Sequence, residues 1–173
     1  VIIGKNVTNI VIDYYIGDCN PSYTTVEEGN QSYVIDNGWV VNKTTNTLFG
    51  AANVKRNKTH SVIDDLPTYI EHIGMYAFSD CTALNEITIP DSVVGIGESS
   101  FDGCNSLESI TLPNGVSSIG IAAFSGCTNL TQMGFGDEIN YIGTAAFDAC
   151  FHLEPLPLYK IKIDTVFGNS FWG

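Results

Sequence analysis

The sequence predicts a repeat solenoid, in which successive coils stack and their short strands run parallel. Residues 67–158 consist of four ungapped copies of a 23-residue segment. Three classes of apolar residue recur in register: Ile73, Ile96, Ile119 and Ile142; Phe78, Phe101, Phe124 and Phe147; Cys81, Cys104, Cys127 and Cys150. A fixed period of this length is the signature of stacked structural repeats, because no single copy can bury its apolar face alone.

Each copy can be interpreted as one coil with a strand and a return segment. In the pattern Leu107–Leu112, the two-residue alternation directs Ile110 and Leu112 inward and Ser109 and Thr111 outward. A proline then ends the strand. We expect a short helical turn at 98–102 that carries Phe101 into the core and ends at Gly103, a natural left-handed position. Stacking of the Phe residues would form the spine of the core.

The repeated cysteines predict a buried ladder of reduced thiols. They recur at the repeat period, three residues before a leucine, where a buried Cys acts as a small hydrophobic residue. The chain has no CxxC motif, and a 23-residue spacing fits no zinc motif. A fifth cysteine, Cys19, could be a nucleophile in principle, but no histidine has a suggestive position and its place in a repeat predicts burial.

We interpret the whole chain, 1–173, as one solenoid domain with irregular ends. Residues 1–26 are a degenerate repeat, and 159–173 form a truncated one. Residues 27–60 break the period and are expected to form an inserted β-hairpin or meander, because Asn37-Gly38 between two β-rich runs favours a two-residue turn. The basic stretch 54–60 is expected to be a solvated loop. These irregular ends suggest a fragment of a longer repeat protein.

Composition argues against several functions. The formal net charge of −12 argues against nucleic acid and against anionic membrane surfaces, and the acidic residues, scattered along the sequence, are expected to be a solvated surface. No apolar run is long enough to insert into a membrane, and no signal peptide is present in this chain. There is no catalytic, nucleotide-binding or EF-hand motif, and His60, His72 and His152 lie in different coils. We therefore expect no enzyme activity, catalytic residue, metal or cofactor.

The repeated pattern I-x-L-P-x-x-V-x-x-I-G-x-x-A-F-x-x-C-x-x-L resembles the BspA-like, Treponema-type leucine-rich repeat. The resemblance covers 67–158 without gaps and the two ends loosely. It implies a leucine-rich-repeat solenoid, a right-handed and β-rich α/β superhelix with a parallel sheet on its concave side and short helical or 3-10 turns on its convex side. It also implies secreted or cell-surface proteins, mostly bacterial and in some cases from anaerobic protists, that act as adhesins.

The strongest functional candidate is the outward face of the predicted strands. This concave face is expected to present seven polar residues to a protein or glycan ligand, with the chain acting as a monomer: Glu86, Thr88, Glu108, Ser109, Thr111, Thr131 and Gln132. A second candidate surface is the exposed rim of the insertion, with Tyr33 and Trp39, although Trp39 could equally pack beneath the hairpin. Two alternatives stay open, namely structural spacer repeats and the non-catalytic part of a larger multidomain enzyme.

Overall fold

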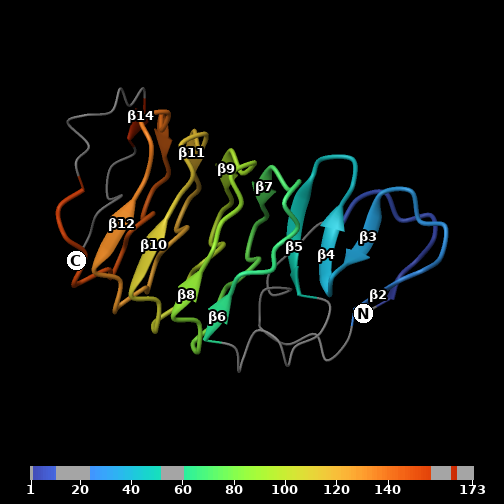
Figure 1. The fold of residues 1–173 in the computed structure, drawn as a ribbon, viewed down its shortest axis with the longest axis horizontal. Helices are drawn as coiled ribbons and strands as arrows, with labels where there is room; N and C mark the ends of the chain where they lie inside the picture. Colours follow the sequence, from blue (N-terminus) through green and yellow to red (C-terminus); the bar gives the residue numbers. More distant parts are fainter. Residues whose placement is uncertain (1, 11–23, 52–60, 157–164, 167–173) are drawn as a thin grey trace.

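The computed structural model describes residues 2–10, 24–51, 61–156 and 165–166, and within them it shows a row of stacked coils built from short strands (Figure 1). No helix that could cross a membrane occurs among these residues. The strands are β1 (Ile2–Ile3), β2 (Thr25–Val26), β3 (Tyr33–Asp36), β4 (Trp39–Asn42), β5 (Thr47–Ala51), β6 (Val62–Ile63), β7 (His72–Ile73), β8 (Glu86–Ile87), β9 (Gly95–Ile96), β10 (Ser109–Thr111), β11 (Ser118–Ile119), β12 (Gln132–Gly134), β13 (Tyr141–Ile142) and β14 (Thr165–Val166).

Each regular coil contributes strands to two faces of the solenoid. The predicted strands form one face, where β6 pairs with β8 and β10 pairs with β12, all parallel. The return segments and the inserted strands β3, β4 and β5 together form a second, continuous sheet in the order β14-β13-β11-β9-β7-β5-β4-β3. Its register aligns the repeated isoleucines, with Ile73 opposite Ile96 and Ile119 opposite Ile142. No strand was predicted from the sequence in the return segments of the coils.

A glycine after each repeated isoleucine lets neighbouring coils approach closely. A Cβ atom added at Gly97 would lie 2.7 Å from the carbonyl carbon of Gly74, and one at Gly120 would lie 2.6 Å from the amide nitrogen of Glu98. Because real Cβ contacts do not occur at such distances, only glycine fits at this point of the coil. The Ile-Gly pair therefore combines an inward side chain with a backbone that can be covered directly by the next coil.

The helical turn expected at 98–102 is not confirmed, since the described part of the chain contains no helix. Alternate amides leave the segment: Ser99 donates to Ile121, Phe101 to Ala123 and Gly103 to Ser125 in the next coil, at 2.8 Å each. Ser99 and Gly103 also have positive φ angles of 49° and 72°. A continuous helix needs its amides to donate back along the same segment, so this intercoil ladder excludes one. Gly103 does occupy the left-handed position expected of it.

Stacked side chains fill the interior of the coils. Phe78, Phe101 and Phe124 stack with ring centroids 5.1 Å apart, and Phe147 follows at 5.7 Å. The four repeated cysteines are reduced and buried, as predicted. From the second copy onward, each thiol donates to the carbonyl of a phenylalanine in the preceding coil; the Cys104 Sγ to Phe78 O distance is 3.0 Å. The repeated columns are thus the core itself.

The meander β3–β4–β5 completes one end of this core. Strand β5 runs parallel to β7 and places Leu48 opposite Ile73. Trp39 of β4 is fully buried and meets Phe78 edge-on at 5.7 Å, where a fifth phenylalanine would otherwise stack. The connecting turn has Asn37 and Gly38 both at positive φ, 48° and 82°. An antiparallel meander therefore supplies the contacts that another coil would make.

The N-terminal residues form a second, smaller core on the other side of the meander. Ile3 is buried there with Tyr33 and Val40, whereas Trp39 and Val41 on either side of Val40 face the coils. Strand β1 pairs in parallel with β2, and the Val7 amide donates to the Gly4 carbonyl at 3.0 Å, the same turn bond that Val93 makes with Pro90. Residues 2–10 thus retain coil geometry without the full repeat pattern.

Candidate binding face

The strands β6, β8, β10 and β12 form the strand face, which carries all seven candidate residues. Backbone hydrogen bonds between successive coils align equivalent positions of this face, since Asn85 donates to Ser61 at 2.8 Å, Thr131 to Glu108 at 2.9 Å, and Glu154 to Thr131 at 2.9 Å. The pairing of β10 with β12 places Ser109 opposite Gln132 and Thr111 opposite Gly134. All seven side chains are exposed: Glu86, Thr88, Glu108, Ser109, Thr111, Thr131 and Gln132.

The strand face is interrupted and hollowed rather than flat. Strands β8 and β10 belong to separate two-stranded sheets, although they follow one another in the stack. A hollow of about 320 Å³ lies there, lined by Glu86, Thr88, Ser109 and Thr111 among others. A second hollow of about 430 Å³ lies along β10, β12 and residues 154–156. Several of the candidate residues therefore border hollows and not a flat surface.

The last described coil ends the pairing on this face. Two prolines occupy positions 155 and 157, and the structure assigns no strand to residues 153–156. Proline has no amide hydrogen to donate to a neighbouring strand. Strand β12 is therefore the last paired strand of this face within the described residues.

The rim of the insertion is not the exposed surface that the sequence allowed. Trp39 is 0% exposed and Tyr33 is 1% exposed. The Trp39 indole donates to Asp65 Oδ1 at 3.2 Å, and the Tyr33 hydroxyl accepts a hydrogen bond from the Ile10 amide at 2.9 Å. Trp39 packs in the core of the coils and Tyr33 in the smaller N-terminal core. The interpretation of this rim as a binding surface is therefore wrong, and the packing alternative holds.

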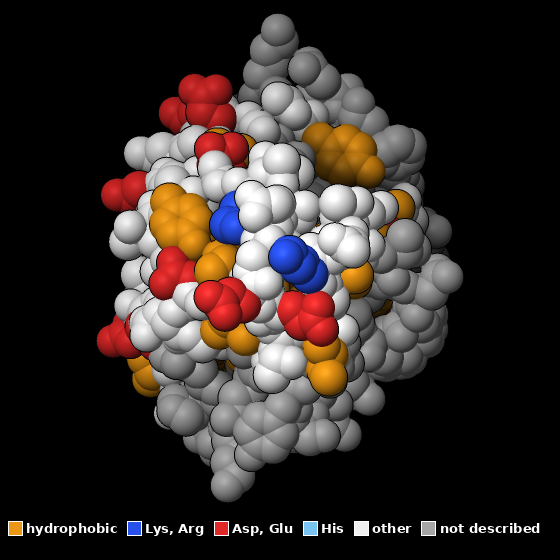
Figure 2. Space-filling model, turned by 90° about the vertical axis from the view of Figure 1, so that its right-hand side faces the viewer, with side chains coloured by type: hydrophobic (Ala, Val, Ile, Leu, Met, Phe, Trp, Pro, Cys, Tyr) orange, Lys and Arg blue, Asp and Glu red, His pale blue; other side chains and the backbone are white. Residues whose placement is uncertain are grey.

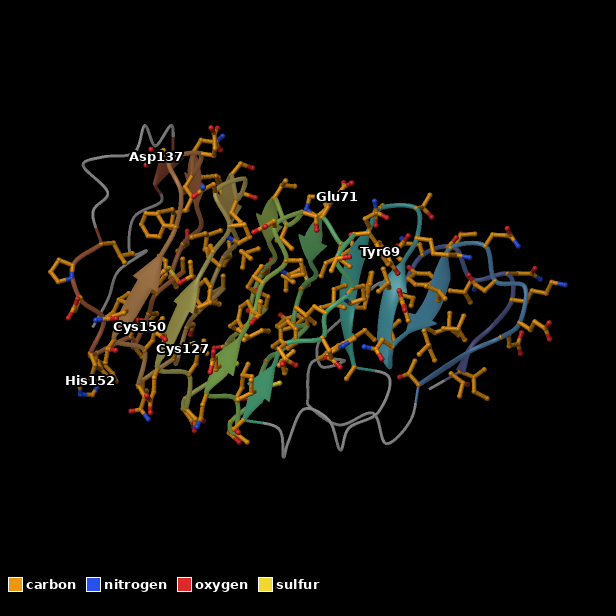
Figure 3. The ribbon with its side chains drawn as sticks, in the orientation of Figure 1. Tyr69, Glu71, Cys127, Asp137, Cys150 and His152 are labelled. Carbon is orange, nitrogen blue, oxygen red and sulfur yellow. The ribbon has the colours of Figure 1, made fainter. Side chains whose placement is uncertain are left out.

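Polar side chains join the meander to the first regular coil. The Tyr69 hydroxyl donates to Asp36 Oδ2 at 2.8 Å, and burial together with this carboxylate raises the Tyr69 pKa to about 12. Asn46 donates to Glu71 Oε1 at 3.1 Å. Figure 3 shows Tyr69 and Glu71 beside this junction. These contacts fix the orientation of the meander and so have a structural explanation.

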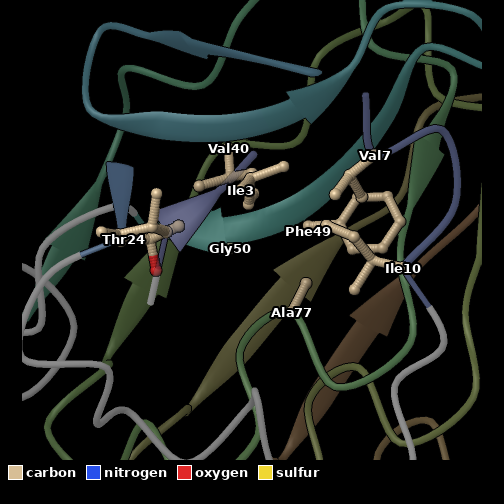
Figure 4. Close-up of a pocket in the computed structure, with 10 residues that line it drawn as sticks. Ile3, Val7, Ile10, Thr24, Val40, Phe49, Gly50 and Ala77 are labelled. Atoms are coloured by element: carbon tan, nitrogen blue, oxygen red, sulfur yellow. The ribbon is translucent and has the colours of Figure 1, made fainter. Parts of the chain in front are cut away.

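An apolar cavity of about 140 Å³ lies between the N-terminal core and the meander. In Figure 4, Val7, Phe49 and Ile10 gather on one side of it and Ile3 and Val40 on the other. Thr24 is the one polar side chain among the residues that line it. A specific ligand site needs several convergent polar groups, so the strand face remains the better candidate.

The histidines that the structure describes lie apart from one another, and the repeated cysteines are buried. His72 and His152 are both exposed and lie in different coils, and His152 Nδ1 lies 2.7 Å from the Thr128 carbonyl; His60 and Cys19 lie outside the described residues. Burial raises the pKa of the Cys127 thiol far above its usual range and that of Cys150 to about 12. Figure 3 shows both thiols on the side of the stack away from Glu71 and Asp137. In the part of the chain that the structure describes, no group of three His, Cys, Asp or Glu side chains could hold a metal ion.

Comparison with solved structures supports the fold. A leucine-rich repeat protein from Eubacterium ventriosum matches with a TM-score of 0.72 and 27% identity, over 88% of this chain and 40% of that one. One from Bacteroides ovatus matches with a TM-score of 0.51 and 33% identity, over 71% of this chain and 31% of that one. A leucine rich cell surface protein from Faecalibacterium prausnitzii shares the fold, with a TM-score of 0.57 and 23% identity, over 77% of this chain and 40% of that one.

The sequence comparisons add the family. The chain spans two fifths or less of the length of these solved proteins. No curated protein matches it. The profile of the BspA type leucine rich repeat region, with 6 copies, matches residues 57–173, which is more than half of the chain. The chain therefore belongs to the BspA-type leucine-rich-repeat family.

Proposed function

We propose that this chain is a binding module of a secreted or cell-surface bacterial protein and that its strand face adheres to a host protein or glycan. The observation that carries the proposal is that Glu86, Ser109 and Gln132 occupy equivalent positions in successive coils and are exposed beside hollows in the strand face. Their backbones are held by the stack, so the side chains are positioned before a ligand arrives, and such preorganisation reduces the entropic cost of binding. The cell-surface protein from Faecalibacterium prausnitzii, which shares this fold, supports the location.

The proposal can be tested with a steric block at the centre of the strand face. The 173-residue chain would be titrated against immobilised extracellular-matrix proteins and a glycan array. Ser109→Tyr places a ring in the hollow between β8 and β10 without changing charge. Asn140→Tyr is the matched control, because Asn140 is exposed beside β13 in the other sheet. The proposal expects saturable binding that Ser109→Tyr abolishes and Asn140→Tyr preserves.

The spacer alternative gives the opposite outcome. The seven candidate residues include no aromatic or arginine side chain of the kind that dominates tight interfaces. If the repeats serve only to hold another domain away from the cell, no matrix protein or glycan will bind saturably to the chain, or Ser109→Tyr and Asn140→Tyr will bind equally well. Either result would overturn the proposed role of the strand face.

A further inference from the structure

The charges of this chain are divided sharply between the coil stack and its flanks. All seven Lys and Arg residues lie outside residues 61–156, whereas thirteen of the nineteen Asp and Glu residues lie inside that segment. The stack thus has a formal charge of −13 and the rest of the chain of +1. The acidic residues of the stack are Asp64, Asp65, Glu71, Asp80, Glu86, Asp91, Glu98, Asp102, Glu108, Asp137, Glu138, Asp148 and Glu154.

On the strand face, three carboxylates are exposed, and none of them has a Lys or Arg partner among the residues that the structure describes. Glu86, Glu108 and Glu154 are all exposed there, on three different coils. Glu86 and Glu108 lie on neighbouring coils and Glu154 lies two coils beyond Glu108, so the face presents three like charges along the stack. Within the described ranges, Lys5 and Lys43 are the only Lys or Arg residues, and they belong to the N-terminal part of the chain, before the coil stack. Figure 2 shows the blue lysine side chains at that end of the molecule.

The hydrogen-bonding groups on the same face match the donors of a cation. Carboxylates only accept hydrogen bonds, whereas the hydroxyls of Ser109 and Thr111 and the amide of Gln132 can both accept and donate. Lysine and arginine side chains only donate, and their bonds to carboxylates are the stronger, charge-assisted kind. The face therefore suits a partner whose contact surface is rich in lysine and arginine.

Other ligand classes fit this face less well. Nucleic acids, anionic lipids and sulfated or sialylated glycans carry the same sign of charge as the stack and would be repelled. Neutral glycans are commonly held by flat aromatic rings with polar groups around them, and none of the seven candidate residues of this face is aromatic. Repulsion between stacks of formal charge −13 also disfavours a second copy of the chain.

We propose that the strand face binds a lysine- and arginine-rich segment of a protein partner, with Glu86, Glu108 and Glu154 as its charged anchors. This inference rests on the proposed function and narrows its ligand from a protein or glycan to a basic protein. Electrostatic attraction should speed the encounter, and binding should weaken as salt shortens the screening length from about 10 Å at 0.1 M to about 3 Å at 1 M.

The probe for the test is a lysine-rich peptide, with the same peptide acetylated at every lysine as its neutral counterpart. Both would be titrated into the full chain and into two variants of equal charge. The face variant combines Glu86→Gln, Glu108→Gln and Glu154→Gln. The control variant combines Asp80→Asn, Glu98→Gln and Asp148→Asn, which lie in the turn segments around the phenylalanine column.

The inference expects the face variant to bind the lysine peptide roughly tenfold more weakly and the control variant to stay within roughly threefold of the parent, given the modest strength of exposed pairs. It also expects no binding of the acetylated peptide. Equal losses in the two variants would show attraction to bulk charge and overturn the inference, as would tight binding of the acetylated peptide.

A second readout separates this inference from the proposed function. A matrix protein that binds the parent chain would be tested against the face variant and against Ser109→Tyr. Loss with both variants supports the basic partner. Loss with Ser109→Tyr alone keeps the strand face as the binding surface but overturns its preference for basic partners. Retention with both overturns the proposed function as well.

Discussion

The coil stack and the meander cover the phenylalanine column in two different ways. In the stack, Phe78, Phe101, Phe124 and Phe147 arise from exact repetition, and backbone hydrogen bonds between coils hold them in register. In the meander, whose sequence lacks the repeat, antiparallel strands present Trp39 to this phenylalanine column and Leu48 to the isoleucine column beside it. The column therefore requires an apolar side chain at the right position, and repetition is only one means of placing it.

The two regions also differ in how they satisfy their backbones. The coils use neighbouring coils as partners, whereas the N-terminal part adds one buried side chain, Asn30, to the backbone pairing of β1 with β2. Asn30 accepts hydrogen bonds from the Ser32 and Tyr33 amides and donates to the carbonyls of Gly4 and Val7, at 2.7 to 3.1 Å. Stability is therefore distributed along the stack and concentrated at single residues near the meander, which the following substitutions can test.

The largest effect is expected from Phe101→Ala in the centre of the stack. The ring has stacked neighbours on both sides at 5.1 Å and is fully buried, so its loss leaves a cavity and removes both contacts. We expect the free energy of unfolding to fall by about 3–5 kcal/mol. Urea unfolding would measure it, with the exposed Phe151→Ala as control. A loss below about 1 kcal/mol would contradict a spine of stacked rings.

The next effect is expected at the meander from Asn30→Ala. The substitution leaves two amides and two carbonyls without their side-chain partner. Because an unsatisfied buried group costs about 1–3 kcal/mol, we expect a loss of at least about 2 kcal/mol. The adjacent, exposed Gln31→Ala provides the control. Similar unfolding free energies for the two variants would show that Asn30 does not hold the N-terminal core to the meander.

A gain in stability is expected from Ser100→Ala. The Ser100 hydroxyl is buried without a hydrogen-bond partner among the described residues, and alanine stands at the equivalent positions 77, 123 and 146. Removing the hydroxyl should raise the free energy of unfolding by about 1 kcal/mol, as judged by urea unfolding. The exposed Ser109→Ala should have little effect. Destabilisation by Ser100→Ala would show that the environment of position 100 differs from that of the equivalent positions 77, 123 and 146.

The smallest effect concerns Asp102, on the turn side of the stack. Burial raises its pKa, and the charge of Asp80 adds to this, while a hydrogen bond from Ser125 opposes it. A raised pKa in the folded state means that the folded protein holds the proton more tightly than the unfolded chain. The resulting stability is present below the unfolded pKa of about 3.9 and is lost as pH rises through the folded value.

Asp102→Asn should therefore raise the melting temperature at pH 7, and the difference should vanish at acidic pH, where the parent carboxyl is protonated. Thermal unfolding across the pH range would measure both. A difference that stays constant with pH would exclude titration of Asp102 as its cause.

The period predicted much of this structure because stacking makes every equivalent position share one environment. It identified the Phe, Cys and Ile columns and the outward positions of Ser109 and Thr111. Strands such as Gly95–Ile96 were not predicted, because two residues that include a glycine show neither alternation nor β propensity. The positive φ of Ser99 could not be predicted either, because serine rarely adopts such a backbone conformation. The hydrogen bonds between coils stabilise this conformation.

The strand face was predicted as a set of residues but not as a shape. Alternation places Glu86 and Ser109 on one surface, yet equivalent repeats give no reason to expect β8 and β10 in separate sheets with a hollow between them. For Trp39, the sequence left exposure at the rim and burial beneath the hairpin both open, and the structure shows burial. This burial depends on the end of the phenylalanine column, which is far away in the sequence and close in space.

Thiol accessibility tests the registered stack most directly. In a Cys19→Ser chain, Cys81, Cys104, Cys127 and Cys150 are the remaining thiols, and all four are buried and reduced. Titration with a thiol reagent at pH 8 should detect almost none of them in the native protein and all four after denaturation, because burial both blocks access and suppresses the thiolate. Rapid reaction of all four thiols in native buffer would contradict the stack, and so would fewer than four after denaturation without reductant.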